Sequence, residues 1–389
     1  MNRSIIHLDL DCFFVACEIL RDNRLRGKPI IVGGKSDRGV VASCSYEARH
    51  FGVRSAMPIR YALQRCPEAL VIRGDMDMYS NYSHLVTTII RELSPAFEKA
   101  SIDEFYIDMT GMDTFYASYQ WAQELEQAIY RESGLDISFG LSINKTVAKM
   151  ATNEGKPRAQ LEVPLPEVRP FLNPLSVSKI PQIGKQTFRI LSRSGIRRIR
   201  TLAEMPVAFM VNLLGKNGRT IWERANGIDE RPIVPYNEKK SISAERTFTQ
   251  DTIDIIYLRA QLLKLTEGLA YELRQSGRLA SVVSVKLRYT NFDTHSKQRR
   301  IPYTANDQQL IRVVHELFGQ LYERRMLIRL VGVKLSGLVQ GYVQMDLFED
   351  TGEQTALNNA LDEVRRKFGK SAIQRAVNLP SPNEQKTNP

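Results

Sequence analysis

Two short apolar segments, each interrupted by carboxylates, constrain this chain more than any other feature. Residues 5–14 and 100–108 have the length and apolar content of core strands, and they contain Asp9, Asp11, Asp103 and Glu104. A buried carboxylate without a partner is costly, and a divalent cation commonly compensates such a charge. Two interruptions of the same kind therefore indicate a common cause, a metal site shared by two strands.

The first segment alternates with the period of a strand. This period predicts a half-buried strand with Ile6, Leu8 and Leu10 on one face and His7, Asp9 and Asp11 on the other. No cluster of histidines or cysteines lies nearby, so the oxygen donors favour Mg²⁺ or Mn²⁺ over zinc. The alternative interpretation is that these acidic residues only end strands and serve solubility.

Four ordered motifs resemble those of the Y-family DNA polymerases, most closely the bacterial members. They are Asp9-Leu10-Asp11-Cys12-Phe13-Phe14, Ser43-Cys44-Ser45-Tyr46-Glu47-Ala48-Arg49, Ser101-Ile102-Asp103-Glu104 and Asn153-Glu154-Gly155-Lys156-Pro157. The resemblance extends from about residue 3 to about residue 340. It implies a template-directed DNA polymerase of the translesion type, with low fidelity and low processivity.

The resemblance also implies an α+β multidomain fold of the right-hand polymerase type. We expect a palm at residues 1–163, with fingers inserted at about 20–75, and a helical thumb with a helix-hairpin-helix-like segment at 164–228. A linker at 229–243 would lead to a βαββαβ little finger at 244–340. Residues 341–389 would contain a clamp-binding motif, an amphipathic helix and a disordered tail. Helical spacing further predicts core stripes of Leu85, Ile89 and Leu93, and of Trp121, Leu125 and Ile129.

The resemblance assigns roles to individual residues of the expected palm and fingers. Asp9, Asp103 and Glu104 would be catalytic and, with the Leu10 carbonyl, would hold two Mg²⁺ ions, for which Mn²⁺ could substitute. The deoxynucleoside triphosphate would contact Phe13, Phe14, Tyr46, Arg49 and Lys156. Phe14 would be the steric gate that leaves no room for a ribose 2′-hydroxyl.

Charge and patterning are consistent with a nucleic-acid partner. The chain has 54 Lys and Arg against 43 Asp and Glu, a net charge of +11, although ribosomal or membrane-surface proteins are similarly basic. We expect primer-template DNA to contact Lys185 and Arg189 beside a hairpin at residues 180–185, and Lys286 and Arg288 on the polar face of a strand. Gln182 stands where this hairpin usually has glycine, which predicts a looser turn, and a helical bundle with a solvated basic face is the alternative.

The expected tail contains a peptide that resembles the sliding-clamp motif of bacterial polymerases. Gln344, Asp346, Leu347 and Phe348 would dock on the beta subunit of the clamp. Leu357, Leu361, Val364 and Phe368 follow with the spacing of an amphipathic helix, which could fold back on the protein or meet a partner.

Several other classes fit less well. The chain has no leader pattern and no long apolar run, and its cysteines lack a metal-binding or disulfide spacing, so we expect a monomeric cytoplasmic protein with no membrane contact. A haloacid dehalogenase-type phosphatase would use Asp9 as nucleophile and Asp11 as acid, but Cys12, Phe13 and Phe14 are bulkier than the residues usual there. A catalytically silent, DNA- or clamp-binding relative would be expected to lack one of the three carboxylates, and all three are present.

Overall fold

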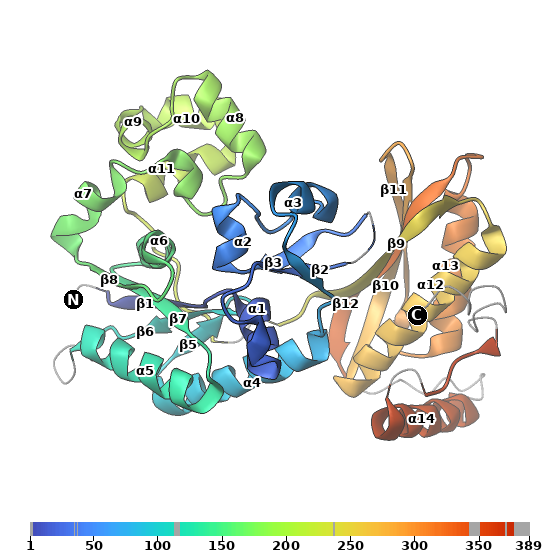
Figure 1. Ribbon diagram of the computed structural model, residues 1–389. Helices are drawn as coiled ribbons and strands as arrows, with labels where there is room; N and C mark the ends of the chain where they lie inside the picture. Colours follow the sequence, from blue (N-terminus) through green and yellow to red (C-terminus); the bar gives the residue numbers. More distant parts are fainter. Residues whose placement is uncertain are drawn as a thin grey trace. The chain divides into compact units, whose positions relative to one another are not determined.

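The computed structural model describes residues 3–34, 36, 38–112, 117–235, 238–341, 351–369 and 372–376. The chain divides into two compact units, Met1–Asn237 and Glu238–Pro389, which are treated separately below (Figure 1). The predicted clamp-binding residues Gln344, Asp346, Leu347 and Phe348 lie outside the described residues. Among the described residues, every helix is too short or too polar to cross a membrane.

A five-stranded sheet forms the centre of the first unit. Its strand order is β5 (Phe97–Lys99), β6 (Glu104–Asp108), β1 (Ile5–Leu10), β7 (Ile137–Ser142) and β8 (Gln160–Val163). β1 is antiparallel to both of its neighbours. The two acidic segments of the sequence therefore lie side by side at the middle of the sheet.

Helices cover both faces of this sheet (Figure 1). They are α4 (Met76–Leu93) and α5 (Ser118–Ser133) on one face and α6 (Lys145–Gly155) on the other. The prediction of a half-buried β1 was wrong, because every residue of β1 is buried. α6 covers the face that carries His7 and Asp9, and the Nδ1 atom of His7 lies 2.8 Å from the Thr152 hydroxyl of α6.

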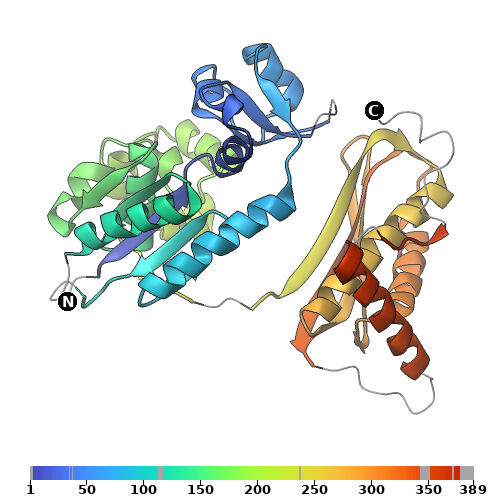
Figure 2. The ribbon, with the colours of Figure 1, turned by 60° about the horizontal axis from the view of Figure 1, so that its bottom comes forward.

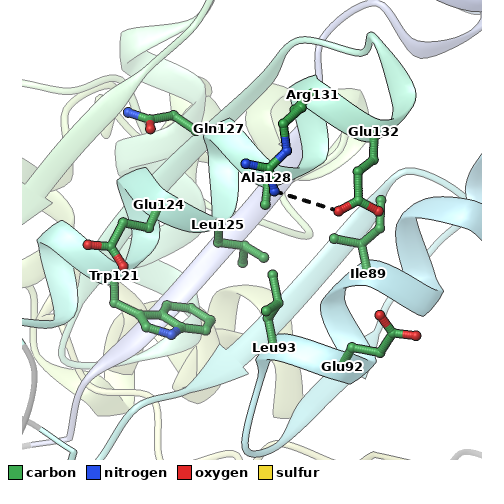
Figure 3. Close-up of a pocket in the computed structure, with 10 residues that line it drawn as sticks. All are labelled: Ile89, Glu92, Leu93, Trp121, Glu124, Leu125, Gln127, Ala128, Arg131 and Glu132. Atoms are coloured by element: carbon green, nitrogen blue, oxygen red, sulfur yellow. Dashed lines mark ion pairs between the residues drawn. The ribbon is translucent and has the colours of Figure 1, made fainter.

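The predicted core stripe on α4 was also partly wrong. Ile89 is buried, but Leu85 and Leu93 are 37% and 48% exposed. α4 instead turns Tyr79, Val86 and Ile90 into the core. Figure 3 shows the outer groove between α4 and α5, a pocket of about 360 Å³ lined by Ile89, Glu92, Leu93, Trp121, Glu124, Leu125, Gln127, Ala128, Arg131 and Glu132.

A small second sheet in the first unit has its own hydrophobic core. Its sheet has the order β3 (Val41–Cys44), β2 (Ile30–Gly33) and β4 (Leu70–Ile72). The accompanying helices are α1 (Phe13–Arg21), a 3-10 turn at Asn23–Leu25, α2 (Tyr46–His50) and α3 (Ile59–Arg65). Ser45 is the N-cap of α2, and its hydroxyl oxygen accepts the Ala48 amide hydrogen. This cap fixes Tyr46 as the first residue of the helix.

The remainder of the first unit is helical. It contains α7 (Val168–Leu172), α8 (Lys185–Arg193), α9 (Ile199–Glu204), α10 (Val207–Leu214) and α11 (Lys216–Ala225), with 3-10 turns at Leu165–Glu167 and Val177–Lys179. The hairpin before α8 is not loosened by Gln182. This residue adopts the left-handed φ of +76° that glycine favours, and the Ile183 amide donates to the Ile180 carbonyl at 3.1 Å. The buried Arg224 stabilises the turn by donating to the Pro181 carbonyl and to Gln182 Oε1 at 2.8 and 2.9 Å.

The second unit has the expected βαββαβ order. The elements are β9 (Ser241–Thr252), α12 (Ile255–Gln275), β10 (Arg278–Tyr289), β11 (Thr294–Thr304), α13 (Asp307–Leu321) and β12 (Ile328–Gln340). They form an antiparallel sheet of order β11-β10-β12-β9. Along β10, Val283, Val285 and Leu287 are buried against the helices while Lys286 and Arg288 are partly exposed, as the alternation predicts.

The final helix, α14 (Thr351–Phe368), folds back onto α12 (Figure 2). Arg274 of α12 donates to both carboxylate oxygens of Asp362 at 2.6 and 2.9 Å and to Asp307 at 2.5 Å. The predicted apolar stripe is only partly covered: Leu361 and Val364 are partly buried, whereas Leu357 and Phe368 are 53% and 66% exposed. Of the two outcomes that the sequence left open, the helix folds back on the protein, where the ion pairs of Arg274 hold it.

Candidate active site

Asp9 and Glu104 are paired directly across β1 and β6. The Leu10 amide donates to the Asp103 carbonyl at 3.0 Å, which continues the pairing past the start of β6. Oxygen atoms of Asp9 and Glu104 and a ring nitrogen of His7 all lie within 4.8 Å of one another. The strand register thus brings together two of the three carboxylates that the sequence singles out.

Two lysines neutralise these carboxylates. Lys149 of α6 donates to both oxygens of Glu104 at 2.7 and 2.6 Å, and Lys156, just after α6, forms an ion pair with Asp9. None of the four sequence motifs contains Lys149, so the sequence did not indicate its role.

The charge state of Asp9 is strongly perturbed. Burial raises the pKa of Asp9 to about 7, the ion pair with Lys156 opposes this rise, and the nearby Glu104 and Asp103 add to it. The adjacent carboxylates of Asp9 and Glu104, with Asp103 near enough to raise the pKa of Asp9, form an oxygen donor set that fits a hard divalent cation such as Mg²⁺ or Mn²⁺.

Asp103 lies in the turn that leads into β6. Its Oδ1 atom accepts a hydrogen bond from the Ser101 hydroxyl at 2.5 Å. The same hydroxyl oxygen accepts the amide hydrogens of Asp103 and Glu104 at 3.3 and 3.0 Å. Ser101 therefore shapes the turn that presents both acids, a role that its place in the motif did not reveal.

Asp11 has surroundings quite different from those of Asp9. The strand ends at Leu10, and Cys12 adopts a left-handed φ of 46°. Asp11 is 5% exposed and accepts hydrogen bonds from Tyr46, Ser138 and the backbone of Arg158. A buried carboxylate saturated by donors is badly placed to act as the acid of a phosphatase.

The two phenylalanines of the first motif occupy distinct environments. Phe13, for which the resemblance implied a nucleotide contact, is 3% exposed and has its ring in the core, while Phe14 is only partly buried. The Phe14 ring stacks on Tyr79 with centroids 4.4 Å apart and planes 14° apart. Tyr79 is fixed in turn by its hydroxyl, which donates to the buried Glu18 at 2.6 Å. Phe14 is therefore the ring held rigidly at the edge of the core, and Tyr79 is a support that sequence spacing did not indicate.

The predicted phosphate contacts gather near the same end of β1. The Arg49 guanidinium lies over the Tyr46 ring, 4.8 Å from its centroid. Burial, reinforced by Asp11, raises the pKa of Tyr46, so its hydroxyl remains a hydrogen-bond donor. Lys156 pairs with Asp9, and the Tyr46 hydroxyl donates to Asp11. The segments that carry Lys156 and Tyr46 therefore contact two carboxylates of the same motif.

The predicted DNA contacts belong to α8 of the first unit and to β10 of the second unit. Lys185 and Arg189 are exposed at the start of α8. In the second unit, Lys286 pairs with Glu245, and Arg288 donates to the Thr294 hydroxyl at 2.9 Å. Within the described part of the chain, Lys185 and Arg189 have no ion-pair partner, whereas Lys286 and Arg288 are already engaged within the sheet.

Comparison with known proteins identifies the family. Residues 8–153 match the impB/mucB/samB family, and residues 239–347 match the C-terminal domain of that family. A DNA polymerase IV from Dehalococcoides mccartyi (strain CBDB1) is 37% identical over 376 residues, covering 96% of each chain. A DNA polymerase IV from Halorhodospira halophila is 37% identical over 349 residues, covering 89% of this chain and 98% of that one.

A solved structure agrees with these relatives. The Y-family DNA polymerase chimera Dbh-Dpo4(243-245)-Dbh superposes with a TM-score of 0.78 at 26% identity, covering 86% of this chain and 99% of the chimera. The mixed α+β architecture and the βαββαβ unit thus match a Y-family polymerase. This chain belongs to the Y family of DNA polymerases, in its DNA polymerase IV group, and is a DNA-directed DNA polymerase.

Proposed function

We propose that this polymerase extends a primer by two-metal nucleotidyl transfer at Asp9, Asp103 and Glu104. The observation that carries the proposal is the pairing of Asp9 with Glu104, each neutralised by a different lysine. The two lysines supply the positive charge that such a site requires. With the Leu10 carbonyl, the three carboxylates would hold two Mg²⁺ ions, and Mn²⁺ could replace them.

The bound cations would lower the pKa of the primer 3′-hydroxyl and neutralise the triphosphate. The protein's own residues orient the reactants. Asp9 and Glu104 are fixed by the strand register, and Ser101 fixes the turn that carries Asp103. The hydroxyl then attacks the α-phosphate, forming the new phosphodiester bond and releasing pyrophosphate.

Tyr46, Arg49 and Lys156 would bind the triphosphate. Arg offers a planar pair of donors to phosphate oxygens and Lys a compact charge. On nucleotide binding, Lys156 would exchange its pairing with Asp9 for the phosphate, leaving the Asp9 carboxylate to the cation. Phe14, stacked on Tyr79 and next to the buried Phe13, would exclude ribonucleotides.

The exposed Lys185 and Arg189 would contact the DNA backbone without reading sequence. Lys286 and Arg288 would contribute from the open face of the second sheet, where the partial exposure of both side chains supports this role. A grip that depends on phosphate contacts is consistent with low processivity. Membership of the Y family supports an active site that tolerates damaged templates and has low fidelity.

Recruitment by the sliding clamp would offset this weak grip by raising the local concentration of the enzyme on DNA. The support for this part is the sequence of Gln344, Asp346, Leu347 and Phe348, which resembles a clamp-binding peptide. Its direct test is clamp-dependent primer extension by the wild type and by a Leu347→Ala, Phe348→Ala variant. Equal stimulation of both by the clamp would contradict it.

Primer extension on an undamaged primed template tests the assignment of the carboxylates. The wild type should give short, distributive products with Mg²⁺ and the four deoxynucleotides. The Asp103→Ala and Glu104→Ala variants should lose extension by at least about a thousandfold while binding primer-template DNA normally. Asp108→Asn is the matched control, because this carboxylate lies at the other end of β6 from Glu104 and accepts the amide hydrogen of Thr110 at 2.9 Å. Normal extension by Asp103→Ala would contradict the assignment.

A further inference from the structure

Asp11 joins two segments that are far apart in sequence. Its Oδ1 atom accepts the Tyr46 hydroxyl hydrogen at 3.0 Å. Its Oδ2 atom accepts the Ser138 hydroxyl at 2.8 Å and the Arg158 amide at 2.7 Å. All three partners donate, and Asp11 is only 5% exposed, so water competes little for these bonds.

The contacts on Oδ2 hold the loop that carries Lys156. Arg158 adopts a left-handed φ of 50°, which is unfavourable for a residue with a side chain. The hydrogen bond that the Arg158 amide donates to Asp11 stabilises this conformation. Ser138 extends the same support, because its hydroxyl oxygen also accepts the Ala159 amide hydrogen at 2.9 Å. The turn immediately after Lys156 is thus anchored to Asp11 directly and through Ser138.

The contact on Oδ1 of Asp11 holds Tyr46 and, through it, Arg49. The Tyr46 ring supports the Arg49 guanidinium at 4.8 Å, so orienting the Tyr46 hydroxyl also orients the group that stacks on its ring. The Asp11 carboxylate therefore sets the distance between two groups of residues. One group is Tyr46 and Arg49, and the other is the loop that carries Lys156.

We propose that Asp11 is a positioning residue for nucleotide binding, which fixes the spacing of the triphosphate contacts and leaves the reacting atoms to Asp9, Asp103 and Glu104. This inference rests on the proposed triphosphate contacts of Tyr46, Arg49 and Lys156. It assigns the second carboxylate of the Asp-x-Asp motif to substrate affinity, while the first serves catalysis.

Asp11→Asn removes the contact to one of the two segments with almost no change in side-chain volume. An asparagine side chain has one acceptor oxygen and one donor nitrogen, so it can accept from Tyr46 or from Ser138 and Arg158, but not from both. Ser138→Ala is a milder second variant, because it removes one hydroxyl from a fully buried strand position and affects only the loop side.

The experiment measures kcat and KM for a single deoxynucleotide on a primed template, together with inhibition by inorganic tripolyphosphate. We expect Asp11→Asn to raise both KM and the tripolyphosphate inhibition constant by about tenfold, with kcat changed less than about threefold, since one hydrogen bond to a charged group is lost. Ser138→Ala should shift both in the same direction by a smaller factor. The Asp108→Asn control should retain the wild-type KM.

A residue that served stability alone would lower the active fraction, so kcat would fall while KM and tripolyphosphate inhibition stayed constant. That result would overturn the inference. Lys156→Ala, measured in parallel, separates the two levels of the argument. If Lys156→Ala raises KM and Asp11→Asn does not, only the role of Asp11 is wrong. If Lys156→Ala also leaves KM unchanged, the triphosphate contact itself is wrong, and the inference fails with it.

Discussion

Asp9 of β1 and Glu104 of β6 face each other across an antiparallel ladder, and the ammonium groups of Lys156 and Lys149 neutralise them separately. Both lysines come from the helix α6 and the residue that follows it. The charge balance of the site therefore depends on the packing of one helix against the central sheet.

The first prediction concerns pH and the stability of the metal-free protein. The folded-state pKa of Asp9 is raised from 3.8 to about 7, so the folded protein binds the proton more tightly than the unfolded chain. The stability that this group contributes is fully present below about pH 4 and is lost as the pH rises through about 7. Asp9→Asn has no such titration. The difference in melting temperature, variant minus wild type, should increase between about pH 5 and about pH 8 in the presence of a chelator.

Thermal unfolding followed by circular dichroism at several pH values checks this expectation. The comparison cancels the titration of all other groups as long as they behave alike in both proteins. A difference that stayed constant with pH would show that Asp9 does not titrate in this range.

The second prediction separates the two adjacent phenylalanines. Phe14→Ala should increase ribonucleotide incorporation relative to deoxynucleotide by about a hundredfold or more, because the ring stacked on Tyr79 is removed. Phe13→Leu should leave this selectivity unchanged and lower only the free energy of unfolding, since Phe13 is a core residue. Single-nucleotide incorporation assays with both sugars measure the ratio, and equal ratios in Phe14→Ala and the wild type would remove Phe14 as the gate.

The third prediction concerns the hairpin that precedes α8. Lys185→Ala and Arg189→Ala should weaken DNA binding to a similar degree for all template sequences. Each should also reduce the slope of log affinity against log salt by about one, because each removes one phosphate contact. Arg131→Ala is the control, since Arg131 lies on the outer groove beside Glu132 (Figure 3). Fluorescence anisotropy at several salt concentrations gives the slopes, and an unchanged slope for both variants would place DNA elsewhere.

The fourth prediction addresses the docking of α14. Arg274→Ala would leave the buried carboxylates of Asp307 and Asp362 without their shared cation, and should cost about 3–5 kcal/mol of unfolding free energy. Arg200→Ala breaks the exposed pair with Glu204 and should cost less than about 1 kcal/mol. Urea denaturation of the full chain measures both. Equal, small losses would mean that the network does not stabilise the docked helix.

Local patterns predicted individual strands and helices, and the family resemblance implied how they combine into the α+β fold. Two apolar segments with central acids predicted neighbouring strands, and the alternation along residues 283–290 predicted which side of β10 is buried. The motifs containing Asp9 and Glu104 predicted a carboxylate site shared by two strands, and the register of β1 and β6 pairs these two residues. The order of the βαββαβ unit could be read from hydrophobic periodicity.

Contacts between distant segments could not be predicted in this way. Periodicity placed Asp9 and Asp11 on one face of one strand, but the chain turns after Leu10, and Asp11 meets donors from Tyr46, Ser138 and Arg158. Only the packing of α6 buried the second face of β1 and brought Lys149 to Glu104. The sequence by itself determined the core strands and the acidic residues that they carry, because residue type and local period suffice for that. The tertiary structure decided their partners and burial, because those depend on long-range packing, which no local pattern records.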